Sequence, residues 1–334
     1  MPAFPSLLPR HSLPALCALV CGVGLTALAA GGAGAGDYPN RPIRIVVPFA
    51  AGTQLDLTGR IVAAKLAEAV GQPVVIDNRP GASGNIGSDI VAKAAPDGYT
   101  LLLTGSFITF LPSTMGARAV DPITAFAPIS KISEPPMMIV VNPSLNVKTL
   151  DELIALARKT PGKIAYSTPG VGTSQHLAAM MLQQRTGIEL LHVPYANGGQ
   201  ALNDVVSGIV PVYFSYIGAA EGFLRSGQLK PLAVATAKRA TNWPDVPTVA
   251  ELGYKDFAVS SWNCVLAPAG TPPEIIERLH AELARIVQQP EVRSQFLTMG
   301  SEPMSNTPEQ FSAELKAAVA RWSDVARLAG LRVD

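Results

Sequence analysis

The sequence has few of the side chains that carry covalent or metal chemistry. It contains three cysteines and four histidines in 334 residues. Cys17 and Cys21 lie within the first 36 residues, so Cys264 stands alone in the rest of the chain. The histidines form no H-x-x-x-H pair and join no cysteine cluster, which argues against a zinc site. A single remaining cysteine also excludes an intramolecular disulfide after residue 36.

The sequence also lacks the short motifs of common catalytic folds. It has no G-x-S-x-G nucleophile elbow and no G-x-x-x-x-G-K-[ST] phosphate loop. Residues 81–84 match only half of the first motif and indicate a turn. Cys264 has no histidine beside it in the sequence, so we expect a buried core thiol. These absences predict a protein that is not an enzyme and uses no cofactor and no metal.

Neither sign of charge is in excess. The chain has 26 basic and 25 acidic residues, and without Arg10 the balance is 25 to 25. Nucleic acids and anionic membranes select basic patches, so this balance argues against both as partners. Beyond residue 36, no apolar run reaches the ~20 residues that a membrane-spanning helix usually needs. The composition therefore predicts a monomer that binds a small molecule and no nucleic acid.

The first 36 residues differ from the rest of the chain. Arg10 precedes an apolar run over residues 13–30, and small residues follow. Two A-x-A cleavage sites are present, at 27–29 and 33–35. Basic, apolar and small-residue regions in this order predict a secretory signal peptide over residues 1–36. The alternative, an uncleaved membrane anchor, requires a longer apolar run.

After the leader, apolar strand-like segments alternate with amphipathic helix-like segments. Strands are expected at 43–47, 74–76, 99–103, 164–166, 190–193, 210–214 and 229–235. Helices are expected at 56–70, 151–159, 174–186, 272–289 and 308–328. Such alternation predicts parallel βαβ units, and roughly 300 residues exceed one typical domain. We therefore expect two α/β domains with a cleft between them.

Two glycine-containing loops each join a predicted strand to a predicted helix. Glycine lets backbone N–H groups approach a ligand closely, and a helix N-terminus adds unpaired N–H groups and about half a positive charge. Such a loop can bind a carboxylate without lysine or arginine. The first loop spans residues 48–56 and offers Phe49, Gly52, Thr53 and Asp56. The second loop offers Ser167, Thr168, Gly170, Gly172, Thr173 and Ser174.

A second interpretation stays open for both loops. Strand–glycine–helix junctions are common in α/β folds, and Asp56 or Thr173 can serve only as helix caps. His176 lies near the start of the second helix, where it can donate to a ligand or to a neighbouring loop.

The chain resembles the Bug family of periplasmic solute receptors of tripartite tricarboxylate transporters, and the likeness covers nearly all residues after the leader. The matching segments are Tyr38–Ile43, Val47–Phe49 with Gly52, Asp56 and Arg60, Asn78–Ala82 with Gly84–Gly87, Ala94–Leu101, His192–Tyr195, Asp245–Thr248 and Leu266–Pro272. Ala94–Leu101, with the sequence AAPDGYTL, is the most specific of them.

This resemblance implies a two-lobe periplasmic binding protein of the Venus flytrap type II class, in which each lobe is an α/β sheet flanked by helices. Lobe one would comprise 37–137 with 233–334, and lobe two 138–232. The chain would cross between the lobes near Met138 and Leu232. Both loops would hold one carboxylate through backbone amides, hydroxyl groups and waters. Ser106, Ser215 and Tyr216 would complete the ligand-binding set.

Several residues depart from the family pattern. Thr53 replaces a second glycine, Leu55 replaces a threonine or serine, and Ser215–Tyr216 replaces a common Asp-Asn pair. The carboxylate grip should survive these changes, because Gly52 and the second loop remain. The far end of the pocket should become more apolar if Leu55, Phe107 and Tyr216 line it.

The sequence therefore predicts a receptor in the periplasm that captures a small carboxylate-bearing solute and passes it to the membrane permease subunits of a transporter. Two other interpretations stay open: a ligand sensor that contacts a membrane signalling kinase, and an enzyme that uses the same fold.

The leader yields a direct test. We expect the exported protein to begin between Ala30 and Asp37, because both A-x-A sites place cleavage in this range. N-terminal sequencing of protein from the periplasmic fraction checks this expectation. An intact leader retained in the membrane fraction would contradict it.

Overall fold

The computed structural model describes residues 38–171, 173–195, 198–255, 257–259 and 261–328. The predicted signal peptide and Gly172 of the second loop lie outside these ranges. Within them, no helix combines the length and the apolar character that crossing a membrane requires.

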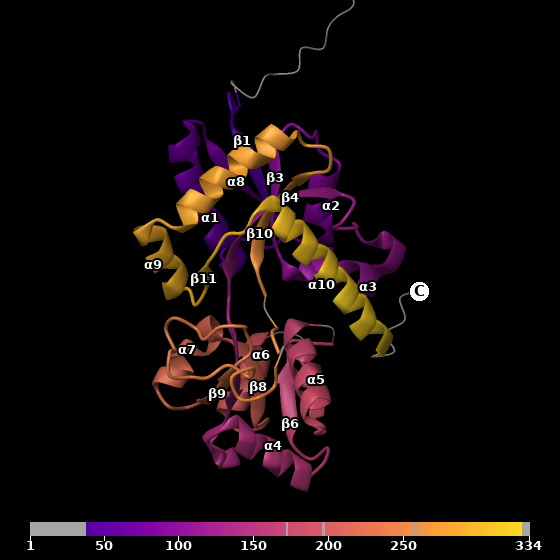
Figure 1. The fold of residues 1–334 in the computed structure, drawn as a ribbon, viewed down its shortest axis with the longest axis vertical. Helices are drawn as coiled ribbons and strands as arrows, with labels where there is room; N and C mark the ends of the chain where they lie inside the picture. Colours follow the sequence, from indigo (N-terminus) through magenta and orange to yellow (C-terminus); the bar gives the residue numbers. More distant parts are fainter. Residues whose placement is uncertain (1–37, 172, 196–197, 256, 260, 329–334) are drawn as a thin grey trace, which may run out of the picture.

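The described strands form two mixed sheets, which lie one above the other in Figure 1. In spatial order, the six-stranded sheet contains β11 (Glu302–Pro303), β4 (Phe126–Glu134), β10 (Asn263–Pro268), β3 (Thr100–Gly105), β1 (Ile43–Val47) and β2 (Val74–Asn78). The five-stranded sheet contains β7 (Leu191–Pro194), β6 (Ala165–Thr168), β8 (Val212–Tyr216), β5 (Met137–Val141) and β9 (Lys230–Val234).

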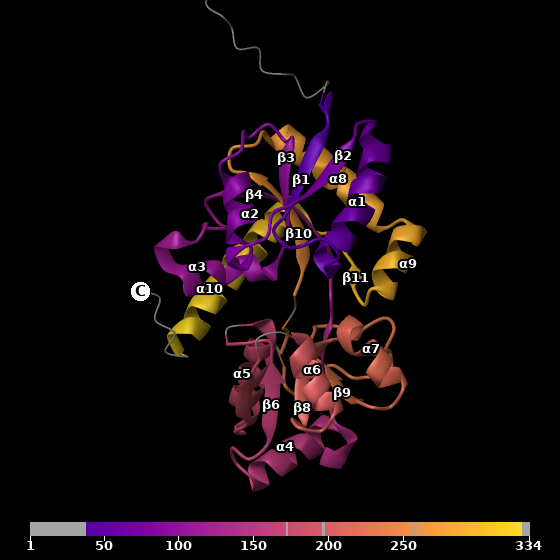
Figure 2. The ribbon, with the colours of Figure 1, turned by 180° about the vertical axis from the view of Figure 1, so that it is seen from behind.

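Helices flank both sheets (Figures 1 and 2). Those of the upper lobe are α1 (Gln54–Val70), α2 (Asn85–Ala92), α3 (Leu111–Met115), α8 (Pro273–Val287), α9 (Pro290–Thr298) and α10 (Pro308–Leu328). Those of the lower lobe are α4 (Leu150–Lys159), α5 (Ser174–Thr186), α6 (Gly198–Val206) and α7 (Ile217–Arg225). Short 3-10 segments are η2 (Ala82–Gly84), η3 (Ser106–Thr109), η4 (Gly116–Arg118) and η5 (Pro143–Leu145).

Strand β5 shows why the sheets lie in the interior of each lobe. Its five residues are all apolar and fully buried. Met137, Ile139 and Val141 join one hydrophobic cluster, while Met138 and Val140 join another. Successive side chains of a strand point to opposite faces, so a continuous apolar run covers both faces at once. The helices on each face then bury these side chains.

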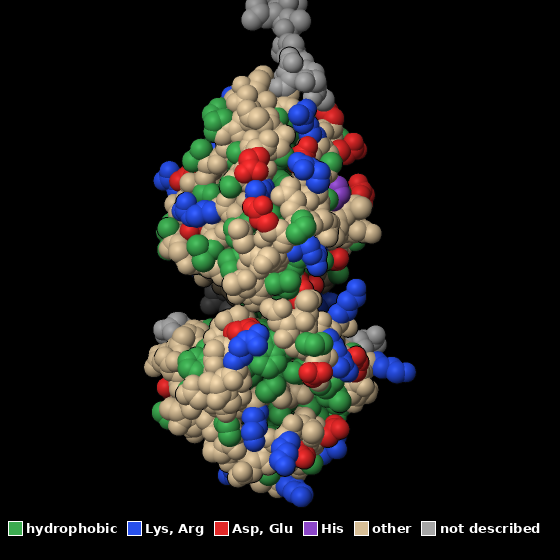
Figure 3. Space-filling view, turned by 90° about the vertical axis from the view of Figure 1, so that its left-hand side faces the viewer, with side chains coloured by type: hydrophobic (Ala, Val, Ile, Leu, Met, Phe, Trp, Pro, Cys, Tyr) green, Lys and Arg blue, Asp and Glu red, His purple; other side chains and the backbone are tan. Residues whose placement is uncertain are grey.

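The two lobes are linked by strands that cross between them. β4 belongs to the upper sheet and β5 to the lower one, and only two residues separate them. The return crossing precedes β10. The space-filling view shows the molecule narrowing between the lobes, with basic and acidic side chains interspersed on that face (Figure 3).

The expected architecture of two α/β lobes, each with a sheet flanked by helices, is confirmed. The sheets differ from the expected parallel units, because β10 runs antiparallel to β3 and β4, and β5 runs antiparallel to β8 and β9. These antiparallel strands adjoin the crossings, so no βαβ pattern marks them.

The lobe boundaries remain a prediction, and the packing favours moving one of them. After β9, the chain returns to the lower sheet through a bridge between Val234 and Thr248. Phe257 and Val259 are buried in the hydrophobic cluster of that sheet. These contacts favour a return crossing between Val259 and Asn263 in place of the one expected near Leu232.

Candidate functional site

The first loop is held in shape by the carboxylate of Asp56. The Gly52 amide donates to Asp56 Oδ2 at 2.8 Å, and Arg60 Nε donates to the same oxygen at 3.0 Å. Asn78 Nδ2 donates to Asp56 Oδ1 and to the Phe49 carbonyl, both at 3.0 Å. Asp56 is only 1% exposed. Its carboxylate therefore orders the loop backbone, and direct contact with a solute stays a prediction.

The charge of Asp56 is stabilised by these donors. Burial alone would raise the pKa of Asp56, but the hydrogen bonds from Arg60, the Gly52 amide and Asn78 outweigh burial and lower the pKa. Gly52 itself has a φ of 83°, which favours glycine. Thr53 caps α1 through its hydroxyl, which accepts from the Asp56 amide. The loop thus buries the negative carboxylate of Asp56 and leads into the N-terminus of α1.

The second loop follows β6 and leads into α5. Gly170 has a φ of 135°, and its amide donates to Thr168 Oγ1 at 3.2 Å. Thr173 caps α5, because its hydroxyl accepts from the His176 amide, and it donates to the Gly170 carbonyl at 2.8 Å. Ser167 is buried, and its hydroxyl donates to the Ala201 carbonyl at 3.2 Å. No lysine or arginine occurs among the described residues of either loop.

A histidine that the loop analysis missed lies beneath the second loop. His192 Nε2 is 2.7 Å from Thr168 Oγ1. Its ring stacks on His176, with ring centroids 4.1 Å apart, and on Tyr166 at 4.9 Å. His192 belongs to β7, whose parallel register places it opposite Tyr166. The HVPY segment was recognised in the sequence only as a family match, because its contact with Thr168 depends on this strand register.

Both imidazoles are held in the neutral state. Burial lowers the pKa of His176. Burial, and then the neighbouring His176, lower the pKa of His192 to about 4. The second loop therefore offers polar groups and helix amides without a full positive charge.

A row of hydroxyl groups connects the lobes. Ser174 Oγ lies 2.8 Å from the Tyr216 hydroxyl, which is also hydrogen-bonded to Ser261. Ser261 Oγ in turn lies 2.9 Å from Ser106 Oγ. Ser174 and Tyr216 belong to the lower lobe, and Ser106 follows β3 of the upper lobe. We call Ser174, Tyr216, Ser261 and Ser106 the hydroxyl bridge. It unites three residues expected at the site with one that sequence analysis missed.

The first turns of α1 and α7 both approach the backbone at Met299. Gln54 Nε2 donates to the Met299 carbonyl at 3.2 Å. A Cβ at Gly218 would lie 2.5 Å from the same carbonyl oxygen. Helix N-termini from both lobes therefore contact one backbone segment, next to the first loop.

Ser215 and Phe49, two residues expected to bind the solute, make contacts within their own lobes. Ser215 is fully buried, and its hydroxyl donates to the Tyr216 carbonyl at 2.9 Å. Phe49 packs edge-on against Phe107, with ring centroids 4.7 Å apart. Whether either residue contacts a solute stays a prediction.

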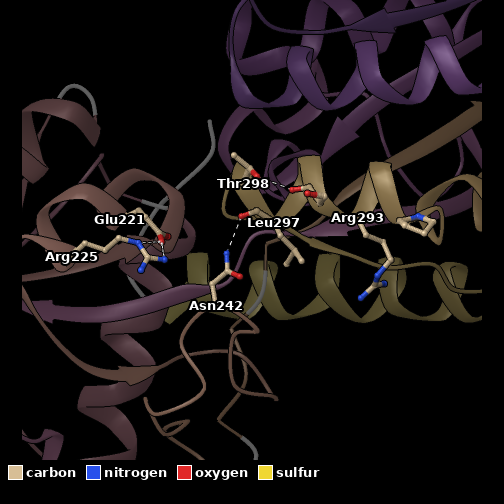
Figure 4. A pocket seen from close by; sticks show the side chains of 8 residues that line it. Glu221, Arg225, Asn242, Arg293, Leu297 and Thr298 are labelled. Atoms are coloured by element: carbon tan, nitrogen blue, oxygen red, sulfur yellow. Dashed lines mark hydrogen bonds and ion pairs between the residues drawn. The ribbon is translucent and has the colours of Figure 1, made fainter.

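Two cavities lie near the narrow region between the lobes. One of about 300 Å³ is lined by Ser106 and Ser174 together with residues of α10. A wider cavity, of about 750 Å³, opens between α7 and α9, where Asn242 Nδ2 donates to the Leu297 carbonyl at 3.1 Å (Figure 4). No residue expected to bind a solute lines the wider one, so its size alone assigns it no role. In the described part of the chain, no group of three or more histidine, cysteine or acidic residues could hold a metal ion.

The lobes, the paired loops and the waist between them define a two-lobe binding protein. A family model for the tripartite tricarboxylate transporter family receptor (TctC) matches residues 58–331. The chain belongs to this receptor family, which confirms the expected solute-binding receptor that is not an enzyme.

Individual relatives are similar to this chain over most of its length. BugT of Bordetella pertussis is 37% identical over 301 residues, which cover 90% of this chain and 92% of that protein. The structure of R. palustris Rpa4515 with adipate is 35% identical with a TM-score of 0.73, and the match covers 88% of this chain and 99% of that one. The structure of Rhodopseudomonas palustris MatC with bound malate is 29% identical with a TM-score of 0.69, over 86% of this chain and 100% of that one.

The neutral His192 makes stability depend on pH. Its pKa is about 4 in the folded protein and 6.5 as an ordinary histidine, so the unfolded chain binds the extra proton between these values. The free energy of unfolding should be fully retained above pH 6.5 and fall as the pH drops toward 4, by on the order of 2 kcal/mol. Urea denaturation at a series of pH values measures this. His192→Gln should flatten the slope by about one proton, and an unchanged slope would contradict the assignment.

Proposed function

We propose that this receptor is exported to the periplasm, captures a small carboxylate-bearing solute between its lobes, and presents that solute to the permease subunits of a tripartite transporter. The single observation that carries the proposal is the pair of loops, one in each lobe, that end at the N-termini of α1 and α5. The leader-like composition of residues 1–36 supports the location. The adipate and malate in relatives of similar fold support the ligand class.

The proposed grip uses partial charges. A helix N-terminus carries about half a positive charge and up to four unpaired N–H groups. Positive φ at Gly52 and Gly170 lets the loop backbone turn so that amides face a ligand. The nearby Arg60 and Arg79 are already engaged by Asp56 and Asp77, with Arg79 Nε 2.9 Å from Asp77 Oδ1. The carboxylate would therefore be held by amides and hydroxyl groups from both lobes, so that capture draws the lobes together.

The grip is tested by changing one glycine. Gly170→Val should weaken carboxylate binding by about tenfold or more, because valine is strained at a φ of 135° and its side chain displaces the loop amides. Gly52→Val should act in the same direction. Calorimetry with adipate as the probe measures the dissociation constant.

Two matched variants accompany this test. Gly227→Val alters another glycine of positive φ, 74°, in the turn between α7 and β9, and should leave affinity within a few-fold of wild type. Arg79→Ala should do the same, because the grip needs no arginine. Abolished binding in Arg79→Ala alone would refute the account based on amides and helix N-termini.

The absence of an acidic residue at position 215 predicts the ligand class. A buried ammonium without a carboxylate partner is costly, because the charge is left unpaired. Aminoadipate should therefore bind at least about tenfold more weakly than adipate, which lacks the amine. Calorimetry on the two acids under one buffer condition decides the matter, and tighter binding of aminoadipate would refute the prediction.

An apolar far end also predicts a preference among acids. Buried apolar surface stabilises a complex by about 25 cal/mol per Å², so acids with an apolar or aromatic body should bind more tightly than citrate. The same calorimetric series, extended to citrate and to an aromatic acid, ranks them.

A further inference from the structure

A set of hydrogen bonds joins the lobes away from the two loops. The Glu302 carboxylate of β11, in the upper lobe, accepts from the Thr241 backbone N–H at 2.7 Å and from the Thr241 hydroxyl at 2.8 Å. The next residue, Asn242, donates from Nδ2 to the Leu297 carbonyl near the end of α9, at 3.1 Å (Figure 4). We call Thr241, Asn242, Glu302 and Leu297 the inter-lobe latch. None of them belongs to the residues expected to bind a solute.

The lower half of the latch is anchored in the core of the lower lobe. Ala240 and Val246, on either side of Thr241 and Asn242, are buried in the hydrophobic cluster between the lower sheet and α7. Trp243 packs against the same cluster, and its Nε1 donates to Glu221 Oε2 of α7 at 3.5 Å. The turn that carries the donors therefore follows any movement of the lower lobe.

The upper half of the latch is anchored equally well. Leu297 follows Phe296, which is fully buried in the hydrophobic cluster between the upper sheet and α1, α8 and α9. Glu302 lies opposite Glu134, the last residue of β4, and β5 of the lower lobe begins three residues later at Met137. The latch thus lies beside the first crossing between the lobes, where it depends on how the lobes are oriented.

Contacts from the latch continue to both halves of the proposed site. In the turn that follows α9, the Met299 carbonyl accepts from Gln54, the first residue of α1. In the lower lobe, Gly218 lies two residues after Tyr216 of the hydroxyl bridge. It approaches Gly300 so closely that a Cβ on Gly300 would lie 2.4 Å from its Cα. The latch therefore adjoins the start of α1 and the start of α7 without forming part of the solute site.

We propose that the inter-lobe latch stabilises the present arrangement of the lobes and thereby raises the affinity for the solute, which it does not touch. In this arrangement Ser106 of the upper lobe joins the same hydroxyl bridge as Ser174 and Tyr216 of the lower lobe, so the two halves of the proposed site lie together. A protein that populates its binding arrangement only in part loses affinity in proportion to that fraction.

The expected effect is several-fold. The latch bonds are exposed to solvent, where the net contribution of a hydrogen bond is modest. Bonds to a carboxylate are stronger than bonds between neutral groups, so Glu302 should contribute more than Asn242. The effect on affinity rests on the function proposed for the two loops, whereas the effect on the lobes does not.

The arrangement of the lobes is measured with spin labels on the full chain. Lys93→Cys in the upper lobe and Lys163→Cys in the lower lobe carry the labels, because both lysines are exposed. Cys17 and Cys21 are replaced by alanine, and Cys264 is fully buried. Double electron–electron resonance on the protein without solute gives the distribution of distances between the labels. Calorimetry with adipate on the same variants gives the dissociation constant.

Three variants test the carboxylate of the latch. Glu302→Ala should broaden the distance distribution and raise the dissociation constant for adipate by roughly threefold to tenfold. Thr241→Val should act in the same direction more weakly, and should add nothing in a double variant with Glu302→Ala, because both changes remove the same contact. Glu302→Gln keeps the shape and an acceptor oxygen, so it should restore most of the wild-type behaviour.

A matched control removes a similar bond within one lobe. The Thr124 hydroxyl donates to Asp121 Oδ2 at 2.9 Å in the upper lobe, and Thr124→Val should change neither measurement. An unchanged distance distribution in Glu302→Ala would overturn the latch, and a broadened distribution with unchanged adipate affinity would overturn its link to capture. If wild-type protein bound no adipate, that result would count against the function proposed for the loops, and the distance distributions would still decide the role of the latch.

Discussion

The carboxylate of Asp56 organises the first loop, and the geometry of the upper lobe's half of the cleft depends on it. An ionised group at 1% exposure is tolerated only when its oxygens are satisfied. Here the Gly52 amide, Arg60 and Asn78 all donate to it. Arg60 is half exposed, whereas the carboxylate is buried, so loss of its donors would leave a buried charge without partners. These hydrogen bonds hold Gly52, a glycine of positive φ, and the start of α1 in one arrangement.

The lower lobe achieves order without a buried charge. Thr168 joins Gly170 and His192 by hydrogen bonds, and the stacked imidazoles support the loop from below. Keeping both rings neutral matters, because a buried imidazolium would add desolvation cost and repel its neighbour. The first loop is therefore ordered by a charged group and the second by neutral groups. In the proposed site, helix amides would supply the positive partial charge on both sides.

The sequence predicted local features well and long-range ones poorly. Helix Ser174–Thr186 was expected with its observed bounds, because the Thr173 cap and Gly187 mark its ends. Strands β4, β5 and β10 were not recognised, since they pair antiparallel near the crossings and lack an adjoining βαβ pattern. The role of His192 depends on the register of β7 against β6. Ser261 joined the hydroxyl bridge only through the folded path before β10. Contacts between residues far apart in the chain carry no periodic signal, and the binding site consists largely of such contacts.

Hydrogen bonds and close backbone contacts join the two lobes in the described part of the chain. The hydroxyl bridge spans the lobes with hydrogen bonds that have a fixed direction, so it tolerates little sliding. Gly218 and Gly300 approach each other so closely that a side chain on either would meet backbone atoms of the other lobe. These contacts between the lobes are therefore of two kinds: backbone against backbone at the glycines, and side-chain hydroxyl groups next to the candidate ligand site.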